Sequence, residues 1–235
     1  MSEPETLVVT PALVVAQVAA CRSLGPRGRL VTLDVPAEVA ASYTAPGQYC
    51  EIRVGERTGY FAIASLPGEA RLSFYVQDNG GSSTALLRCA AGAAVRLGRP
   101  AGEGYRLGAA LADGGPIVAL ATGSGWFGLR SALWAVAAAG RVASVYVGFR
   151  SAAEALDTAG AQALRDRGFS VAVCLSRPGD GWTGRRGYVQ AALAADGPEL
   201  RGAWVLGCGQ SEMLGAAREV CAGLGLLPGR FLTNY

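Results

Sequence analysis

A strand, a glycine-rich turn and a helix follow one another within residues 116–139, and no other feature constrains the fold as strongly. The apolar run 117–121 predicts a buried strand. It breaks at Thr122-Gly123-Ser124-Gly125, and an apolar-periodic segment resumes at Trp126. Glycines let the chain turn tightly and approach a ligand, and the start of a helix presents unpaired N–H groups. The turn therefore suits a phosphate, although an ordinary strand-to-helix turn of an α/β sheet explains it equally well.

The chain after residue 116 alternates between strand and helix patterns. Strands are expected at 117–121, 143–147, 170–175, 203–206 and near 230–233. Helices are expected at 126–139, 152–167, 188–195 and 211–224. This alternation predicts a Rossmann-like parallel sheet with helices on both faces.

The residues before this region predict a different architecture. Short strands separated by Gly, Pro and Asn turns are expected at 13–20, 29–35, 48–54, 60–65, 71–77 and 93–98, with one helix at 83–90. Regular short strands of this kind favour an antiparallel β barrel or sandwich. We therefore divide the chain into a barrel domain, residues 1–110, and an α/β domain, residues 111–235. A ligand is expected in the cleft between them, at the carboxyl ends of the parallel strands.

Composition excludes several classes of function. The chain has 235 residues, 51% of them hydrophobic and 17% charged, which is enough for two domains with sizeable cores. Its net charge of +3 comes without a basic run, so no nucleic-acid partner is expected. Histidine is absent, which excludes catalytic triads and metal sites that need imidazole.

The spacing of the cysteines and the hydropathy of the chain indicate the cellular compartment in which the protein is expected. The six cysteines lie far apart without a C-x-x-C pair, so no metal site or disulfide framework is expected. Most fit buried thiols of a reducing compartment, which favours the cytoplasm. The first residues do not read as a signal peptide, and no apolar run reaches about 18 residues, so no membrane span is expected.

Six segments resemble, in order, the motifs of the ferredoxin–NADP reductase superfamily. They are PGQYCEIRV, GYFAIAS, GGSSTALL, ATGSGWFGLRS, VYVGFRSAAEAL and GCGQSEM, within roughly residues 45–235. Residues 174–193 and the ending GRFLTNY are most similar to a branch with plant and bacterial members. The resemblance implies an FAD-binding barrel followed by an NAD(P)-binding domain. It also implies a flavin-dependent NAD(P)H oxidoreductase that passes electrons to a redox partner protein or subunit, which the sequence does not identify.

Four positions depart from the family pattern. Gly59 stands where the family has an arginine for the flavin phosphate, and Phe61 replaces the tyrosine that packs on the flavin ring. Ala62 replaces a Ser or Thr near flavin N5, and Gly128 replaces a proline. A second function therefore stays open: a non-catalytic nucleotide- or flavin-binding regulatory or scaffold subunit that kept the reductase fold.

The resemblance implies flavin-contacting residues in two segments of the barrel. Those at the ring edge are Tyr60, Phe61, Ala62, Ile63, Ala64 and Ser65, and those at the phosphates are Gly81, Ser82, Ser83 and Thr84. Plain N-capping of a helix also accounts for a hydroxyl residue at position 84.

The resemblance assigns the nucleotide to the ends of the parallel strands. Its contacts would be Thr122, Gly123, Ser124, Gly125, Arg150, Ser176, Arg177, Arg186, Tyr188, Gln190, Gly209 and Met213. By analogy with plant-type reductases, the two arginines at 177 and 186 would hold a 2′-phosphate and Tyr188 would stack on adenine. NADP is therefore expected over NAD, although the same residues also suit a solvated surface loop.

Two residues would face the reacting atoms, according to the resemblance. Cys208 would lie against the nicotinamide ring, and the terminal Tyr235 would cover the flavin. The alternatives are a buried structural thiol and a frayed chain end.

Overall fold

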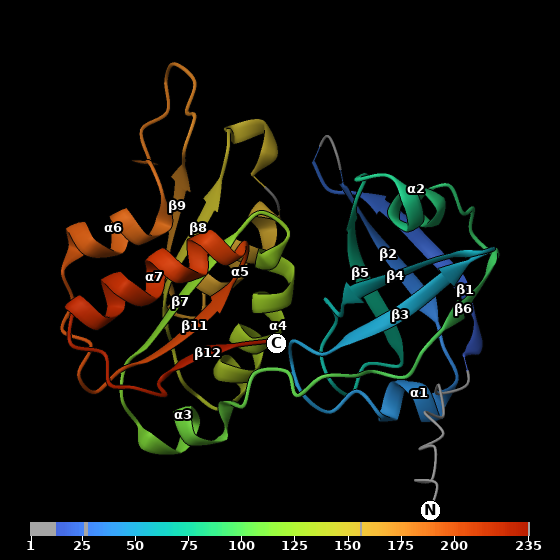
Figure 1. The fold of residues 1–235 in the computed structure, drawn as a ribbon, viewed down its shortest axis with the longest axis horizontal. Coiled ribbons are helices and arrows are strands. Elements are labelled where there is room, and N and C mark those ends of the chain that lie inside the picture. Colours follow the sequence, from blue (N-terminus) through green and yellow to red (C-terminus); the bar gives the residue numbers. More distant parts are fainter. Residues whose placement is uncertain (1–12, 26–27, 156, 235) are drawn as a thin grey trace, which may run out of the picture.

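The computed structural model describes residues 13–25, 28–155 and 157–234, and they form two sheets that lie side by side (Figure 1). The first sheet is antiparallel, in the order β4-β3-β6-β1-β2-β5. Its strands are β1 (Val14–Ser23), β2 (Gly28–Asp34), β3 (Tyr49–Val54), β4 (Arg57–Ala62), β5 (Arg71–Gln77) and β6 (Ala94–Leu97). The residues just after β4 return to β5, through an Ile63–Phe74 bridge and a 2.7 Å bond from the Ala64 amide to the Ser73 carbonyl. These contacts join the two ends of the sheet in the manner of the predicted barrel.

Residues that point into the barrel alternate with residues that point away from it along the strands, and the inward-pointing ones form the core. Val31 and Leu33 of β2 and Leu72 and Phe74 of β5 are fully buried, while their neighbours face outward. Helix α2 (Gly81–Leu87) adds Leu86 to this core, and α1 (Ala37–Ala41) adds Val39.

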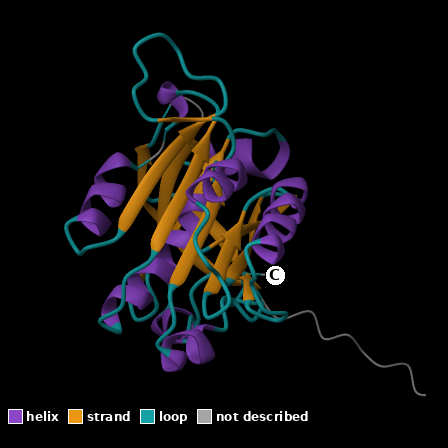
Figure 2. Cartoon of the chain, turned by 90° about the vertical axis from the view of Figure 1, so that its left-hand side faces the viewer, coloured by secondary structure: helices purple, strands orange, loops and turns teal. Residues whose placement is uncertain are grey.

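The second sheet is wholly parallel, in the order β10-β9-β8-β7-β11-β12. Its strands are β7 (Ile117–Thr122), β8 (Ser144–Phe149), β9 (Ser170–Leu175), β10 (Arg185–Arg186), β11 (Trp204–Cys208) and β12 (Phe231–Thr233). One face is covered by α4 (Gly125–Ala138) and α5 (Thr158–Arg165), and the other by α6 (Val189–Asp196) and α7 (Ser211–Gly223) (Figure 2). The predicted fold class is confirmed.

Several elements differ from the sequence prediction. The expected helix at 152–167 is a short 3₁₀ turn, Ala152–Glu154, followed by α5, with Asp157 between them at φ 55°. Helix α2 begins and ends earlier than expected, and α1 and α3 (Leu107–Asp113) were not predicted. These helices have only five to seven residues, too few to display a helical period.

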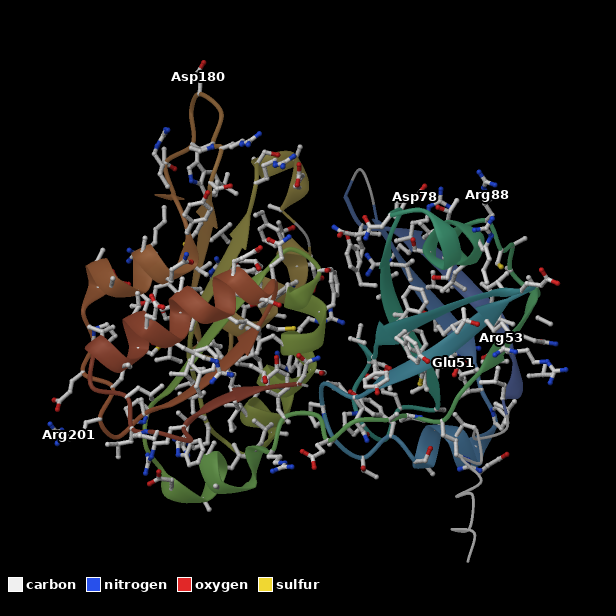
Figure 3. All side chains as sticks on the ribbon, viewed as in Figure 1. Glu51, Arg53, Asp78, Arg88, Asp180 and Arg201 are labelled. Carbon is white, nitrogen blue, oxygen red and sulfur yellow. The ribbon has the colours of Figure 1, made fainter. Side chains whose placement is uncertain are left out.

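The boundary between the two domains stays our proposal at residues 110/111, within α3. The main core of the α/β domain also includes Leu24, Ala64, Tyr75 and Tyr105 from the first part of the chain. The two sheets therefore share a packed interface. Beyond the carboxyl ends of the parallel strands, the loop between β9 and β10 projects away from the sheet, with Asp180 at its tip (Figure 3).

Within the described ranges, no helix has the length and apolar character that a bilayer crossing requires.

Candidate functional site

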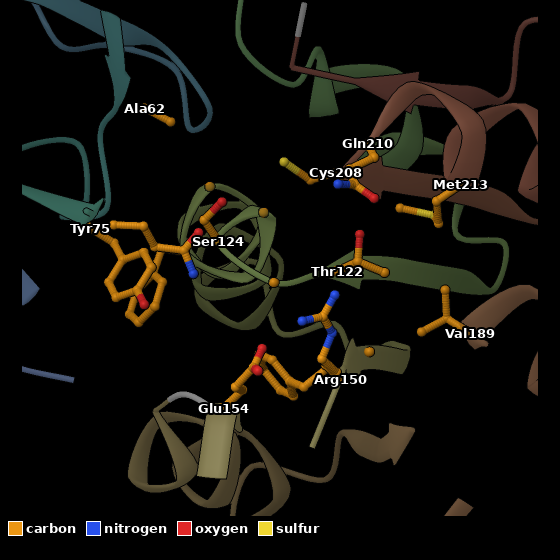
Figure 4. A pocket seen from close by; sticks show the side chains of 18 of the residues that line it. Ala62, Tyr75, Thr122, Ser124, Arg150, Glu154, Val189, Cys208, Gln210 and Met213 are labelled. Atoms are coloured by element: carbon orange, nitrogen blue, oxygen red, sulfur yellow. The ribbon is translucent and has the colours of Figure 1, made fainter. Parts of the chain in front are cut away.

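A cavity of about 950 Å³ lies between the barrel and the parallel sheet (Figure 4). The barrel contributes residues of β4 and β5 and the start of α2. The α/β domain contributes the carboxyl ends of β7, β8, β9 and β11 and the first turns of α4, α6 and α7. This is the edge of a parallel sheet at which ligands usually bind.

The turn between β7 and α4 forms the centre of one wall. Gly123 has φ +53°, a conformation that favours glycine. A Cβ added to Gly125 would lie 2.6 Å from the Cys208 carbonyl oxygen, so a glycine is what lets α4 begin against the end of β11. The Thr122 hydroxyl oxygen is buried and has no hydrogen-bond partner among the described residues. A buried polar atom without a partner is costly, and a ligand in the cavity would satisfy it.

The turn between β11 and α7 lies directly against the first. A Cβ added to Gly209 would lie 2.3 Å from the Thr122 hydroxyl oxygen and 2.4 Å from Met213 Cε. The two turns are therefore packed against each other, and a larger residue at Gly125 or Gly209 would require neighbouring atoms to shift.

Cys208 lies where this surface meets the barrel, and only 7% of it is exposed. Its Sγ donates to Asn234 Oδ1 at 3.5 Å, and Asn234 Nδ2 donates across to the Gly47 carbonyl of the barrel at 3.3 Å. A Cβ added to Gly128 would lie 3.4 Å from Cys208 Sγ and 3.8 Å from Ala62 Cβ. Cys208 and Ala62 therefore border the same space from opposite domains.

Burial raises the pKa of Cys208 to about 11, although a hydrogen bond from Tyr105 opposes the shift. The thiol is therefore neutral at physiological pH, because the charged form is the one that burial penalises. Its chemistry at this position is that of a compact apolar contact rather than that of a nucleophile.

With the flavin and NADPH that the sequence resemblance implies, Cys208→Ala is expected to lower the rate of hydride transfer roughly tenfold while NADPH affinity changes little, because the side chain would orient the nicotinamide. Since the thiol stays protonated, the wild-type rate should show no inflection from this residue between about pH 7 and 9. Stopped-flow bleaching of bound flavin across that range measures both. An unchanged rate in the variant would make Cys208 a structural thiol, and an inflection that disappears in it would contradict the neutral form.

Aromatic side chains line the barrel face of the cavity. The Tyr75 and Phe127 rings stack across the domain interface, with centroids 4.2 Å apart. Phe61 lies over Gly59, whose added Cβ would meet the Phe61 ring at 2.8 Å and Ser82 Oγ at 2.3 Å. The space of an arginine at position 59 is therefore taken by Ser82 and Phe61.

The hydroxyls at the start of α2 are engaged within the protein. Ser83 Oγ accepts from the Asn79 amide and donates to the Gly80 carbonyl, at 3.1 and 2.8 Å. Thr84 donates to the Asp78 carboxylate, and this bond holds the pKa of Asp78 below its usual range. Of the predicted phosphate residues, only Ser83 lines the cavity.

The outer part of the cavity is bordered by polar residues of the α/β domain. Arg150 and Arg177 line it, and the Arg177 amide donates to the Arg150 carbonyl at 2.7 Å, which holds the two strand ends together. Tyr188 is 65% exposed at the rim, and the Gln190 side-chain oxygen is buried without a partner among the described residues. Arg186 lies outside the lining and donates to the Trp182 carbonyl at 3.1 Å.

The cavity brings together most of the predicted residues. They are Tyr60, Phe61, Ala62, Ser83, Thr122, Gly123, Ser124, Gly125, Arg150, Ser176, Arg177, Tyr188, Gln190, Cys208, Gly209 and Met213. It does not bring in Ile63, Ala64, Ser65, Gly81, Ser82, Thr84 and Arg186. Tyr235 lies outside the described residues.

Sequence reasoning missed part of the lining. The main additions are Tyr75, Gln77, Glu154 and Glu212. Tyr75 and Gln77 are two residues apart on β5 and therefore lie on the same face of the strand. Only the closure of the barrel shows that this face borders the cleft. In the part of the chain described, no three acidic or cysteine side chains gather closely enough to hold a metal ion.

An antiparallel barrel joined to a parallel sheet, with glycine turns at the cleft between them, defines a two-domain fold whose parallel half suits a nucleotide. The family model described as oxidoreductase NAD-binding domain matches residues 119–219. The chain is 32% identical over 228 residues to ferredoxin–NADP reductase B of Sorangium cellulosum (strain So ce56), covering 88% of this chain and 91% of that protein. The chain therefore belongs to the ferredoxin–NADP reductase superfamily of flavoprotein oxidoreductases.

Solved structures agree on the fold. A cytochrome P450 reductase of Amycolatopsis is similar with TM-score 0.83 and 24% identity, over 96% of this chain and 71% of that one. The ferredoxin reductase in carbazole 1,9a-dioxygenase has TM-score 0.81 and 21% identity, over 97% and 70%. A ferredoxin NADP⁺ reductase of Neisseria gonorrhoeae with bound FAD and NADP has TM-score 0.77 and 17% identity, over 94% and 98%.

Proposed function

We propose that this chain is a flavin-dependent NAD(P)H oxidoreductase that uses FAD, takes hydride from NADPH and delivers electrons to a redox partner protein. One observation carries the proposal: Ala62 of the barrel and Cys208 of the nucleotide turn border the same space at Gly128. A reductase of this class needs that arrangement, because its two ring systems must meet between the domains. The chain's own sequence relative, a ferredoxin–NADP reductase, supports the same activity.

The residues present fit the ring end of a flavin and a pyridine nucleotide. Tyr75 and Phe61 offer aromatic surface, and the buried oxygens of Thr122 and Gln190, which have no partner in the described part of the chain, favour a polar ligand. FAD, when bound, would supply the capacity to accept a hydride and release electrons one at a time. The fit at the flavin phosphates is poorer, since Ser82 occupies the space beside Gly59 and Asp78 holds the Thr84 hydroxyl.

The contribution of the protein is binding and orientation. The amides at the start of α4 suit the nucleotide pyrophosphate, and Gly123, where an added Cβ would meet nothing within 4 Å, allows its close approach. Cys208 and Asn234 fill the space behind the reacting position and exclude water. No side chain has to transfer a proton, which suits a chain without histidine.

A redox partner is proposed as a separate electron-carrying protein. The proposal places the activity in the cytoplasm, where all six cysteines, free in the structure, would stay reduced. A second function, a non-catalytic nucleotide- or flavin-binding regulatory or scaffold subunit, is favoured by one observation: the Asp78 carboxylate takes the hydroxyl of Thr84, the residue expected at the flavin phosphates.

The absorbance spectrum of the purified chain separates the two functions. We expect the flavin bands, and we expect NADPH to bleach them. A colourless protein that takes up no added FAD would contradict the reductase and favour the scaffold.

A further inference from the structure

Arg130 of α4 connects the two domains beside the cavity. Its Nη2 donates to the Ala64 carbonyl of the barrel at 3.3 Å, and its Nη1 donates to Asp157 Oδ2 at 2.7 Å. The ion pair is mostly buried, with 19% of the Arg130 and 7% of the Asp157 side chain exposed. Its guanidinium also lies 5.4 Å from the centre of the Phe127 ring, the one that stacks on Tyr75 of the barrel. One planar, permanently charged group therefore joins three contacts at the domain interface.

Asp157 is held in an unusual conformation to take part. Its φ of 55° is left-handed, and it is the only non-glycine residue with positive φ among the described residues. Its two oxygens serve different groups: Oδ1 accepts from the Gly160 amide as the N-cap of α5, and Oδ2 accepts from Arg130 and from Trp126 Nε1. Strain of this kind persists where surrounding contacts impose it, and it gathers at functional positions. The break in the predicted helix 152–167 thus places a carboxylate against Arg130.

Arg130 and the residue to which it donates in the barrel, Ala64, each lie close in sequence to a residue that lines the cavity. Ala64 is two residues from Ala62, which borders the reacting space on the barrel side. Arg130 is two residues after Gly128, which borders the same space on the α/β side, and five residues after Gly125, the first residue of α4. A change in the Arg130–Ala64 contact would therefore change the spacing between the walls.

We propose that Arg130, held by Asp157, is a positioning residue that fixes the distance between the flavin wall at Ala62 and the nucleotide wall at Gly128. The inference rests on the proposed function, because it assigns hydride transfer to that space. Arg130 does not line the cavity and acts through the barrel segment that follows β4. Transfer between bound groups is sensitive to their spacing, and a misplacement of about 1 Å can cost roughly a hundredfold in rate.

Arg130→Lys is the test variant, because a single ammonium cannot hold Asp157 and the Ala64 carbonyl in the same fork geometry. Arg141→Lys is the matched control. Arg141 is also partly buried and also donates to two carbonyls, of Leu111 and Gly115, but both lie on the α/β side. Asp157→Asn is a second variant, since Asn tolerates the left-handed conformation and keeps an acceptor for Gly160 while it removes the charge.

Two measurements are made on all four proteins. The first is hydrogen exchange of the ligand-free protein, and we expect faster exchange in Arg130→Lys at residues 62–66 and 123–130. The second is stopped-flow bleaching by NADPH, and we expect a rate roughly tenfold or more below wild type with a dissociation constant for NADPH within about threefold. Asp157→Asn should likewise speed hydrogen exchange at these residues and lower the bleaching rate.

Exchange and bleaching rates equal to those of Arg141→Lys would overturn the inference. A fall in NADPH affinity as large as the fall in rate would also overturn it, because that result describes a binding contact or a general loss of structure. A wild type that NADPH does not bleach would contradict the proposed function instead, and the exchange measurement, which needs no cofactor, would still decide whether Arg130 holds the domains together.

Discussion

Arg177→Ala is expected to lower kcat/KM for NADPH about tenfold to a hundredfold while leaving kcat/KM for NADH nearly unchanged. A charge-assisted hydrogen bond is worth about 1.5–3 kcal/mol, which corresponds to that range in affinity. Because Arg177 is exposed, solvent screening favours the lower part of the range. Steady-state kinetics with both nucleotides, on wild type and variant, measure the effect.

The position of Arg177 gives the physical reason. It follows the carboxyl end of β9 and lines the outer cavity together with Arg150 and Ser176. Tyr188 stands at the same rim, with 65% of its surface exposed, as a stacking surface for an adenine would. We propose that the Arg177 guanidinium holds a 2′-phosphate next to that adenine, because both residues line the same cavity, and NADH has no such phosphate to lose.

Arg201→Ala is the matched control, because it removes the same charge at a distant corner of the α/β domain (Figure 3). Its ion pair with Glu199 is an exposed contact of 3.9 Å. If kcat/KM for NADPH fell equally in the two variants, the effect would come from long-range electrostatics and not from a contact between Arg177 and the 2′-phosphate. A wild type that prefers NADH would contradict the assignment of a 2′-phosphate site.

The sequence predicts the parallel half of the site well, because its signals are local. A glycine after a buried strand shows where the chain turns, and in a parallel sheet all such turns gather at one edge. The structure accordingly brings Thr122–Gly125, Arg177 and Cys208 to one cavity. Burial of these strands on both faces also makes them continuous apolar runs, which are easy to recognise.

The flavin side was harder to predict because its geometry comes from contacts distant in sequence. The pattern GGSSTALL indicates a helix start, but nothing in it shows that Asp78 takes the Thr84 hydroxyl. Tyr75 faces the cleft only because β5 joins the residues after β4, and Arg130 meets Asp157 only through tertiary packing. Arg186 fits the spacing of a phosphate contact, yet the two-residue strand β10 directs its guanidinium to Trp182.

Gly125→Ala is expected to disrupt the nucleotide site. A glycine is needed at this position because a side chain would clash, and its φ is not in the left-handed region that favours glycine. The new Cβ would lie 2.6 Å from the Cys208 carbonyl oxygen, 2.8 Å from its carbonyl carbon and 3.1 Å from the Gly209 amide nitrogen. All three atoms are backbone, so α4 and the end of β11 must move apart. Overpacking of this kind costs about 1–3 kcal/mol. NADPH affinity should fall roughly tenfold or more, because the two turns that form its binding surface separate.

Gly215→Ala provides the matched control in α7. Its added Cβ would meet nothing within 4 Å, and the residue is exposed on a helix. The same substitution there should stabilise the protein by about 0.5–1 kcal/mol, since alanine favours helix over glycine. Urea unfolding and NADPH titration of both variants make the comparison. If Gly125→Ala matched Gly215→Ala in urea unfolding, the close contact between the two turns would not contribute to stability. If it also matched in NADPH titration, the packed surface at Cys208 would not be what holds the nucleotide.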